Sequence, residues 1–312
     1  MWRVAVLHHG SSSSAALHCL RQGLRVRGLV EGHTCVIDVA GAEGRLERLP
    51  GLMEGLLLRR PDVVAVLGAV AALVAQRATA SIPIVHAIVL DPAGIGLRAS
   101  NVTGITTFDA DHGPRQLRLL RELVPGLCTV ALLADRDAPK GTADGANPLA
   151  SRLIHAAGEL RIGVKCVELH GADADISVAF DIFAQARAEA LVVLEVPAVM
   201  ARVDDIGLHV ERHRLPAVFP PGRAQAGVLM MGPALQDAID PLAGYISAIA
   251  SGARVAELPT RTVRHRRLIV HLGNARRIGL AIPDSILQRA THSMDDDGST
   301  EPSSSNASPV NR

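Results

Sequence analysis

The chain has very few aromatic residues. One Trp, one Tyr and four Phe make up 2% of its 312 residues. Sugar receptors and RNA-binding proteins stack their ligands on aromatic rings, so this scarcity argues against both classes. An excess of charge of one sign is also missing, because 32 Lys and Arg face 31 Asp and Glu. A nucleic-acid partner, which usually needs a basic face, is therefore not expected.

Cysteine and metal-binding patterns are sparse as well. The four cysteines form no CxxC pair and have no metal-ligand spacing to histidine, and we interpret them as small buried thiols. They are Cys19, Cys35, Cys128 and Cys166. His8 and His9 have no Asp, Glu or Cys nearby in the sequence to complete a ligand set. We expect neither a metal nor a cofactor.

Long apolar runs and catalytic motifs are missing too. The longest charge-free apolar run, from Val63 to Ala75, is shorter than the ~20 residues that cross a bilayer. We therefore expect no membrane-spanning segment. The sequence holds no GxSxG, HExxH or GxGxxG motif in a catalytic context, so we do not expect an enzyme. No helix-turn-helix precedes Trp2, which argues against a transcriptional repressor.

What the sequence does contain is a regular alternation of short apolar runs and amphipathic segments, which indicates parallel sheets covered by helices on both faces. The pattern occurs twice, and it predicts two doubly wound α/β lobes. The strands expected in the first round are 4–7, 35–39, 63–67 and 84–89, and in the second round 130–133, 164–169, 190–194 and 217–219. The helices expected between them are 14–27, 46–59, 70–78, 149–160, 176–188 and 201–214.

The remainder of the chain is less regular. We expect the join between the lobes near Thr106 to Gly113, a polar stretch. After the second round come a short strand at 228–231, a helix at 235–251, and a strand at 268–272 that leads into a helix. The segment 291–312 is polar and Ser-rich, and we predict that it is disordered.

Five segments carry a family resemblance, in the same order and at similar spacing. They read IPIVHAIVLDPAGIGL (82–97), NVTGIT (101–106), LRLLRELVPG (117–126), ERHRLPAVFPPGRAQAGVLMMG (211–232) and LPTRTVRHRRLIVHLGNARRIGLAIPDSILQRA (258–290). Together they resemble the substrate-binding components of ABC importers related to the bacterial tryptophan/tyrosine-type binding proteins. The resemblance covers roughly residues 3–290.

This resemblance implies a type I periplasmic-binding-protein-like fold, in which a hinge of three crossings joins two Rossmann-like lobes. It places 1–107 and 227–259 in the first lobe, and 108–226 and 260–290 in the second. It further implies that a small solute is captured in the cleft between the lobes, which close on it by a hinge motion. An ABC permease and an ATPase subunit are the expected protein partners.

Ligands of doubly wound sheets bind beyond the carboxyl ends of the strands, so the residues after each strand are the candidates. His9, Gly10 and the run Ser11, Ser12 and Ser13 follow the first strand, and their N–H groups and hydroxyls suit an anion. One serine would also serve as a simple helix cap. Gly68 and Ala69 follow the third strand and offer main-chain contacts. Asp91 follows the fourth, where it binds a ligand ammonium group or caps a turn; both alternatives stay open.

In the second lobe, the candidates at equivalent positions are Asp135, Glu195, Phe219 and Arg223. The family tends to carry aromatic residues near the last three, whereas this chain has mostly aliphatic ones. We therefore expect a small, polar solute that bears a carboxylate, such as an amino acid or a relative. Arg223 and the serine turn would hold its anion, and Asp91 or Glu195 its cation.

The location of the protein and its output remain open at this stage. Family members act outside the cytoplasmic membrane and carry a leader, but Trp2 to Leu7 leads directly into the first strand without the apolar segment of a signal peptide. Three explanations stay open: a leader has been removed, the initiating Met has been assigned downstream of the true start, or the protein stays in the cytoplasm. A cytosolic ligand sensor of the same fold is the main alternative function, and a small-molecule enzyme is a more remote one.

Overall fold

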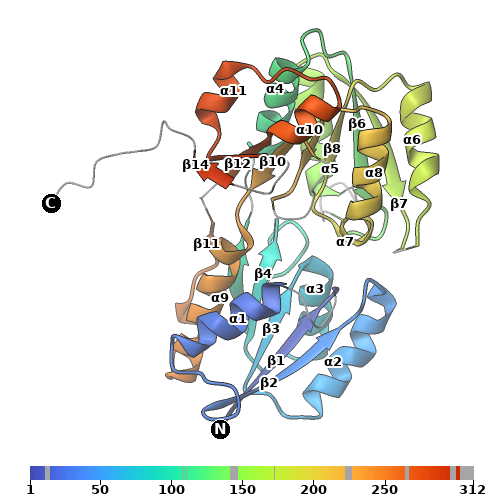
Figure 1. The fold of residues 1–312 in the computed structure, drawn as a ribbon. Coiled ribbons are helices and arrows are strands. Elements are labelled where there is room, and N and C mark those ends of the chain that lie inside the picture. Colours follow the sequence, from blue (N-terminus) through green and yellow to red (C-terminus); the bar gives the residue numbers. More distant parts are fainter. Residues whose placement is uncertain are drawn as a thin grey trace, which may run out of the picture. The chain divides into compact units, whose positions relative to one another are not determined.

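The computed structural model describes residues 1–10, 15–107, 109, 111–140, 147–171, 173–221, 227–263, 267–295 and 300–302. The chain divides into two compact units. Unit 1 comprises 1–109, 137–148 and 235–264, and unit 2 comprises 110–136, 149–234 and 265–312. Each unit is an α/β structure built on its own sheet (Figure 1). The predicted fold class, two doubly wound α/β lobes, is confirmed.

The sheet of unit 1 has six strands in the order β11-β5-β4-β3-β1-β2, and every neighbouring pair is parallel. The central strand β3 is buried at every position, which explains why it reads as an uninterrupted apolar run. The strands are β1 (Trp2–His8), β2 (Cys35–Gly41), β3 (Val63–Leu67), β4 (Ile84–Val89), β5 (Val102–Thr106) and β11 (Arg261–Thr262).

Helices cover both faces of this sheet because the side chains of each strand alternate between the faces. In β1, Val4 and Val6 join one apolar core, and Ala5 and Leu7 join the other. The first core is closed by α1 (Ala15–Arg25) and α9 (Leu235–Ala250), and the second by α2 (Leu49–Leu57) and α3 (Ala69–Ala78) (Figure 1).

Helices α1 and α9 approach each other closely at a glycine. A Cβ atom placed on Gly23 would lie 2.8 Å from the Cβ of Ala243, so only glycine allows this approach. One turn away, the Arg27 guanidinium donates to both carboxylate oxygens of Asp240, at 2.8 and 2.9 Å. This bidentate pair fixes the two helices in the register that the glycine contact permits.

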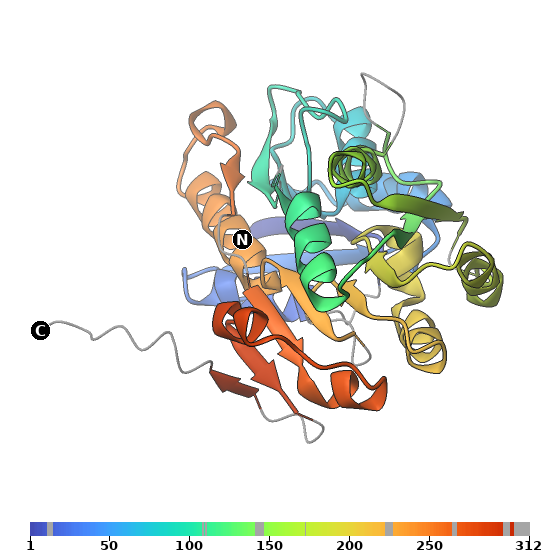
Figure 2. The ribbon, with the colours of Figure 1, turned by 90° about the horizontal axis from the view of Figure 1, so that it is seen from above.

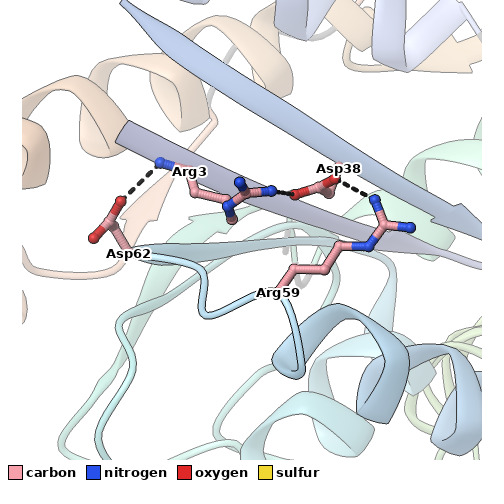
Figure 3. Close-up of polar contacts among 4 residues, drawn as sticks. All are labelled: Arg3, Asp38, Arg59 and Asp62. Atoms are coloured by element: carbon pink, nitrogen blue, oxygen red, sulfur yellow. Dashed lines mark hydrogen bonds and ion pairs between the residues drawn. The ribbon is translucent and has the colours of Figure 1, made fainter. Parts of the chain in front are cut away.

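A buried carboxylate ties the edge strand β2 to its neighbours. Asp38 is 8% exposed and accepts hydrogen bonds of 2.6 Å from Arg3 and from Arg59 (Figure 3). The pKa of Asp38 lies below its usual value, since the bonds from the two guanidinium groups outweigh the opposing effect of burial, which is the largest single influence. The main-chain N–H of Arg3 also donates to Asp62, at 2.7 Å. This cluster lies near the start of β1, and we interpret it as structural.

The sheet of unit 2 has eight strands in the order β14-β13-β12-β10-β9-β8-β6-β7. Its parallel part, 7-6-8-9-10, repeats the order 2-1-3-4-5 of unit 1, and β12 then joins β10 antiparallel. The strands are β6 (Thr129–Asp135), β7 (Gly163–Leu169), β8 (Ala190–Val193), β9 (Ala217–Phe219), β10 (Leu229–Gly232), β12 (Arg267–His271), β13 (His292–Met294) and β14 (Thr300–Pro302).

The helices of unit 2 follow the same alternation with the strands. They are α4 (His112–Leu123), α5 (Pro148–Glu159), α6 (Ile176–Gln185), α7 (Pro197–Ala201), α8 (Val203–Arg212), α10 (Leu272–Arg277) and α11 (Asp284–Arg289). No helix in the described ranges is long and apolar enough to cross a membrane.

Three segments lie elsewhere than the sequence predicts. β10 pairs with β9 and β12 in unit 2, so 227–234 does not belong to the first lobe. β11 pairs with β5 in unit 1, although 260–290 was expected in the second lobe. The chain is ordered at β13, which lies beside β12 (Figure 2), although 291–312 was expected to be disordered. In each case strand pairing with a distant partner decides the position, and neither the family resemblance nor the composition of the tail reported that pairing.

Candidate functional site

In unit 1, the candidate residues lie at one edge of the sheet. β1 pairs with β3, and β3 pairs with β4, all parallel. The carboxyl ends of the three strands therefore lie together, and they carry His9 and Gly10, Gly68 and Ala69, and Asp91. Ser11, Ser12 and Ser13, which continue from Gly10, lie outside the described residues. The described candidates of the first lobe thus come to one edge, as expected from the strand order.

The imidazole of His9 lies against the turn after β3. Gly68 has φ +100°, and a Cβ atom on it would lie 2.9 Å from His9 Nδ1, so glycine is needed here for both space and backbone conformation. The N–H of Gly68 donates to the carbonyl of Ala87 at 2.9 Å, which fixes the turn to β4. Gly68 is also the N-cap of α3 and supplies no side-chain cap. The first N–H groups of α3 therefore begin beside His9.

His8, one residue earlier, is a core residue rather than a surface ligand. Its side chain is 3% exposed, and its buried Nε2 has no hydrogen-bond partner among the described residues. Burial lowers the pKa of His8, against a smaller opposing effect of the Glu43 carboxylate. We therefore expect a neutral imidazole. The loop after β2 closes over this segment, since Ala42 and Gly44 donate to the carbonyls of His8 and His9 at 3.0 and 2.7 Å.

Asp91 forms a turn. Its Oδ1 accepts from the N–H of Gly94 at 2.9 Å, and a Cβ atom on Gly94 would lie 2.4 Å from Asp91 Oδ2. The turn-capping alternative is therefore observed, and contact with a ligand ammonium stays a prediction. Three residues earlier, inside β4, Ile88 has φ 58°, an uncommon conformation for a β-branched residue, at an irregularity in the pairing of β4 with β5.

His86 is a notable buried residue that sequence reasoning did not identify. It lies in β4, is 1% exposed, and its ring packs on β5, where a Cβ atom on Gly104 would lie 2.6 Å from His86 Cγ. Burial lowers the pKa of His86 to about 4, against a smaller opposing effect of its hydrogen bond to the carbonyl of Ile105. A histidine within an apolar run, with a glycine in the next strand, was the available signal.

In unit 2, Asp135 ends β6, and Glu195 follows the neighbouring strand β8. Asp135 is 2% exposed, and its Oδ2 accepts from the N–H of Ala198 at 2.8 Å, in the first turn of α7. Asp135, at the end of β6, thus caps the N-terminus of α7, although α7 follows a different strand, β8. Glu195 is exposed beside that helix. The structure brings these two candidates to one edge and gives them different environments.

Phe219 and Arg223 complete the predicted set. Phe219 is fully buried, and a Cβ atom on Gly227 would lie 2.4 Å from its ring, so Phe219 belongs to the core and presents no surface to a solute. This differs from the expected ligand contact. Arg223 lies outside the described residues.

No exposed aromatic ring lies at the described carboxyl edges, since Phe219, the last residue of β9, is buried. Phe180 and Phe183 are buried in α6, Trp2 begins β1 at the opposite end of its sheet, and Tyr245 donates to the carbonyl of Pro259. Phe108, which follows β5, lies outside the described residues. The described edges therefore offer main-chain N–H groups, an imidazole and carboxylates rather than stacking surfaces. No three His, Cys, Asp or Glu of the described part of the chain are grouped so that they could hold a metal.

Comparison with known proteins gives one family. Residues 3–168, just over half of the chain, match the family described as ABC transporter substrate binding protein. No curated protein sequence matches the chain.

Solved structures share the fold along almost the whole chain. A conserved domain protein from Vibrio cholerae has a TM-score of 0.85 at 21% identity, with 94% of this chain and 99% of that chain covered. An ABC domain in complex with L-Trp from Streptococcus pneumonia has a TM-score of 0.78 at 18% identity, with coverages of 93% and 100%. A ligand-free, open substrate-binding protein from Clostridium difficile has a TM-score of 0.63 at 16% identity, with coverages of 91% and 96%.

Proposed function

The chain belongs to the ABC transporter substrate-binding protein family, and we propose that its solute is a small, polar, carboxylate-bearing molecule, an amino acid or a close relative. The observation that carries this proposal is the chemistry of the described carboxyl edges. They offer main-chain N–H groups, an imidazole and carboxylates, whereas the described ring at these edges, Phe219, is buried. A solute recognised by stacking would find no exposed ring among the described residues of these edges.

The N-termini of two helices in unit 1 favour a solute that bears a carboxylate. α3 begins at Ala69, directly after its N-cap Gly68, which lies beside the imidazole of His9, and α1 begins at Ala15, directly after the serine run. A helix N-terminus presents unpaired N–H groups and the positive end of the helix dipole, which favours an anion. Neither helix has an acidic residue in its first turn that would compete for these groups. We propose that Ser11, Ser12 and Ser13 add hydroxyl contacts to the same anion.

Unit 2 supplies the remaining polar groups. Arg223 follows β9, and we propose that its guanidinium also binds the solute carboxylate, in a charge-assisted contact. For the solute ammonium group we propose Glu195, which is exposed at the edge. Asp135 already accepts from the N–H of Ala198, so we propose that it acts by holding α7 in place.

The family membership implies transporter partners, and we propose that this chain delivers its solute to an ABC permease with its ATPase, outside the cytoplasmic membrane. We further propose that binding occurs without chemical conversion. The family consists of solute-binding proteins, which supports this proposal.

A thermal-shift screen tests the ligand class. Free amino acids and short carboxylates are compared with sugars and with nucleosides, and hits are verified by native mass spectrometry. A ligand at 100 times its dissociation constant adds about 2.7 kcal/mol to the free energy of unfolding, which a melting curve detects easily. Stabilisation by a sugar, with no response to any carboxylate, would contradict the proposed solute. Conversion of the hit on prolonged incubation would contradict the proposal of binding alone.

Substitution of Arg223 tests the anion contact. Replacing Arg223 by Ala should weaken binding of a carboxylate hit by roughly 2–5 kcal/mol, as when one partner of a buried charge pair is lost. Ser12→Ala should cost less, about 0.5–1.5 kcal/mol for a neutral hydrogen bond. Arg25→Ala, at an exposed position in the last turn of α1, is the matched control and should bind as wild type. An Arg223→Ala variant that folds and retains full affinity would remove Arg223 from the site.

A further inference from the structure

Two histidines of unit 2 lie in a small cluster of rings between α6 and α8. Phe180 of α6 stacks on His209 with ring centroids 5.0 Å apart, and it lies 5.3 Å from the ring of His213. The two imidazoles face each other with centroids 6.1 Å apart and an angle of 25° between their planes. Phe183 lies edge-on to Phe180, with ring centroids 5.7 Å apart. The imidazoles are thus held beside each other by packing on one phenyl ring.

The spacing of the pair is one that metal ions use. His209 and His213 are four residues apart, so they lie on the same face of α8, one turn from each other. Histidines at this spacing on a helix supply two ligands to one zinc ion in known metal sites. The i, i+4 spacing of two histidines does not by itself indicate a metal site. The structure adds that both rings already point to the same side of the helix.

A metal ion would displace no described hydrogen-bond partner from the imidazole nitrogens of His209 and His213. Neither ring forms a hydrogen bond or an ion pair with any residue that the structure describes. The Nδ1 atom of the half-buried His209 is enclosed without a partner, which leaves Nε2 as the nitrogen of that ring for an ion. His213 is exposed at the end of α8 and can rotate about its side-chain bonds.

We propose that His209 and His213 form a binding site for a divalent first-row transition ion, such as Zn²⁺, Ni²⁺ or Cu²⁺. An imidazole nitrogen binds zinc at about 2.0–2.1 Å, which places the ring centroids of two ligands about 5 Å apart at a tetrahedral angle and at most about 6.4 Å apart. The observed 6.1 Å is larger than the tetrahedral separation, and the two rings are stacked, so binding requires one ring to turn. A rotation of the exposed His213 ring brings the two nitrogens to one ion.

The chemistry of the donors defines the class of ion. Imidazole suits zinc, copper and nickel, whereas magnesium and calcium prefer oxygen ligands. Two side chains leave the remaining coordination positions to water. The ion would join two successive turns of α8 and so stabilise that helix. The proposed metal site lies on α8 rather than at the carboxyl edge of the sheet. The metal-site proposal is therefore independent of the proposal about the solute.

The test is a titration of the full chain, free of any histidine tag, with NiCl₂ and with ZnCl₂ by isothermal calorimetry. Wild type should bind one ion. His213→Asn suits the end of the helix, and His209→Phe preserves the stack on Phe180. Each should lower the affinity by at least about tenfold, because the loss of even an outer-shell partner costs that much in metal sites.

One control variant and one NMR measurement test whether the ion binds at His209 and His213. His18→Asn, at an exposed position of α1, removes an unrelated histidine and should leave the affinity unchanged. In NMR spectra, traces of Cu²⁺ should broaden the ring protons of His209 and His213 before those of the other histidines. The proposal is overturned if wild type binds no ion, if His213→Asn binds as tightly as wild type, or if copper broadens another histidine pair first.

Discussion

The contact between α1 and α9 allows a prediction in which two opposing effects are weighed. Gly23 lies inside α1, where replacement by Ala gains about 1 kcal/mol of helix propensity. The new methyl group, however, would lie 2.8 Å from the Cβ of Ala243, about 1 Å inside ordinary contact. Both carbons are attached directly to the backbone, so neither can rotate away. Relief requires the two helices to move apart.

That separation is costly for two reasons. Overpacking of a close contact typically costs about 1–3 kcal/mol. Moving α9 outward also lengthens the bonds from Arg27 to Asp240, which are 2.8 and 2.9 Å in the structure. The steric cost therefore exceeds the gain in propensity, and we expect Gly23→Ala to lower the free energy of unfolding by about 1–2 kcal/mol.

Urea denaturation followed by circular dichroism measures this difference, and the chain offers two matched controls. Gly55 lies in α2 with nothing near its missing Cβ, so Gly55→Ala should stabilise the protein by up to about 1 kcal/mol. Ala243→Gly combined with Gly23→Ala moves the methyl group to the other helix and should recover most of the loss. If Gly23→Ala is as stabilising as Gly55→Ala, the reasoning from the close contact is refuted.

Two further predictions concern stability. Because the pKa of His86 is about 4 in the folded protein and about 6.5 in the unfolded chain, the unfolded chain takes up a proton that the folded protein excludes. The free energy of unfolding should therefore fall by about 3 kcal/mol as the pH drops from about 6.5 to about 4, and His86→Leu should remove most of that dependence in urea titrations across this range. Truncation after Ala290 removes β13 and the two bonds of Thr291 to Leu268, so it should cost more than about 1 kcal/mol, whereas truncation after Pro302 is the control that retains β13. Equal melting temperatures for the two truncations would show that β13 contributes nothing.

The sequence alone predicted the alternation of strands and helices, because each element must bury a face and the period of its apolar residues reports that requirement. The first four strands of unit 1 lie where their apolar runs predict, and the collinear motifs indicated a family that the comparison confirms for residues 3–168. The placement of His9, Gly68 and Asp91 at one edge also followed from the order of parallel strands.

Only the tertiary structure decided how individual side chains are used. Asp135 caps α7 across 63 residues of sequence, Phe219 is enclosed beneath Gly227, and β10 remains with unit 2 because its partners are β9 and β12. Periodicity reports which face of an element is apolar. The neighbours that meet a given side chain are set by pairings between distant segments, and those pairings determine whether a polar group is enclosed or left at the surface.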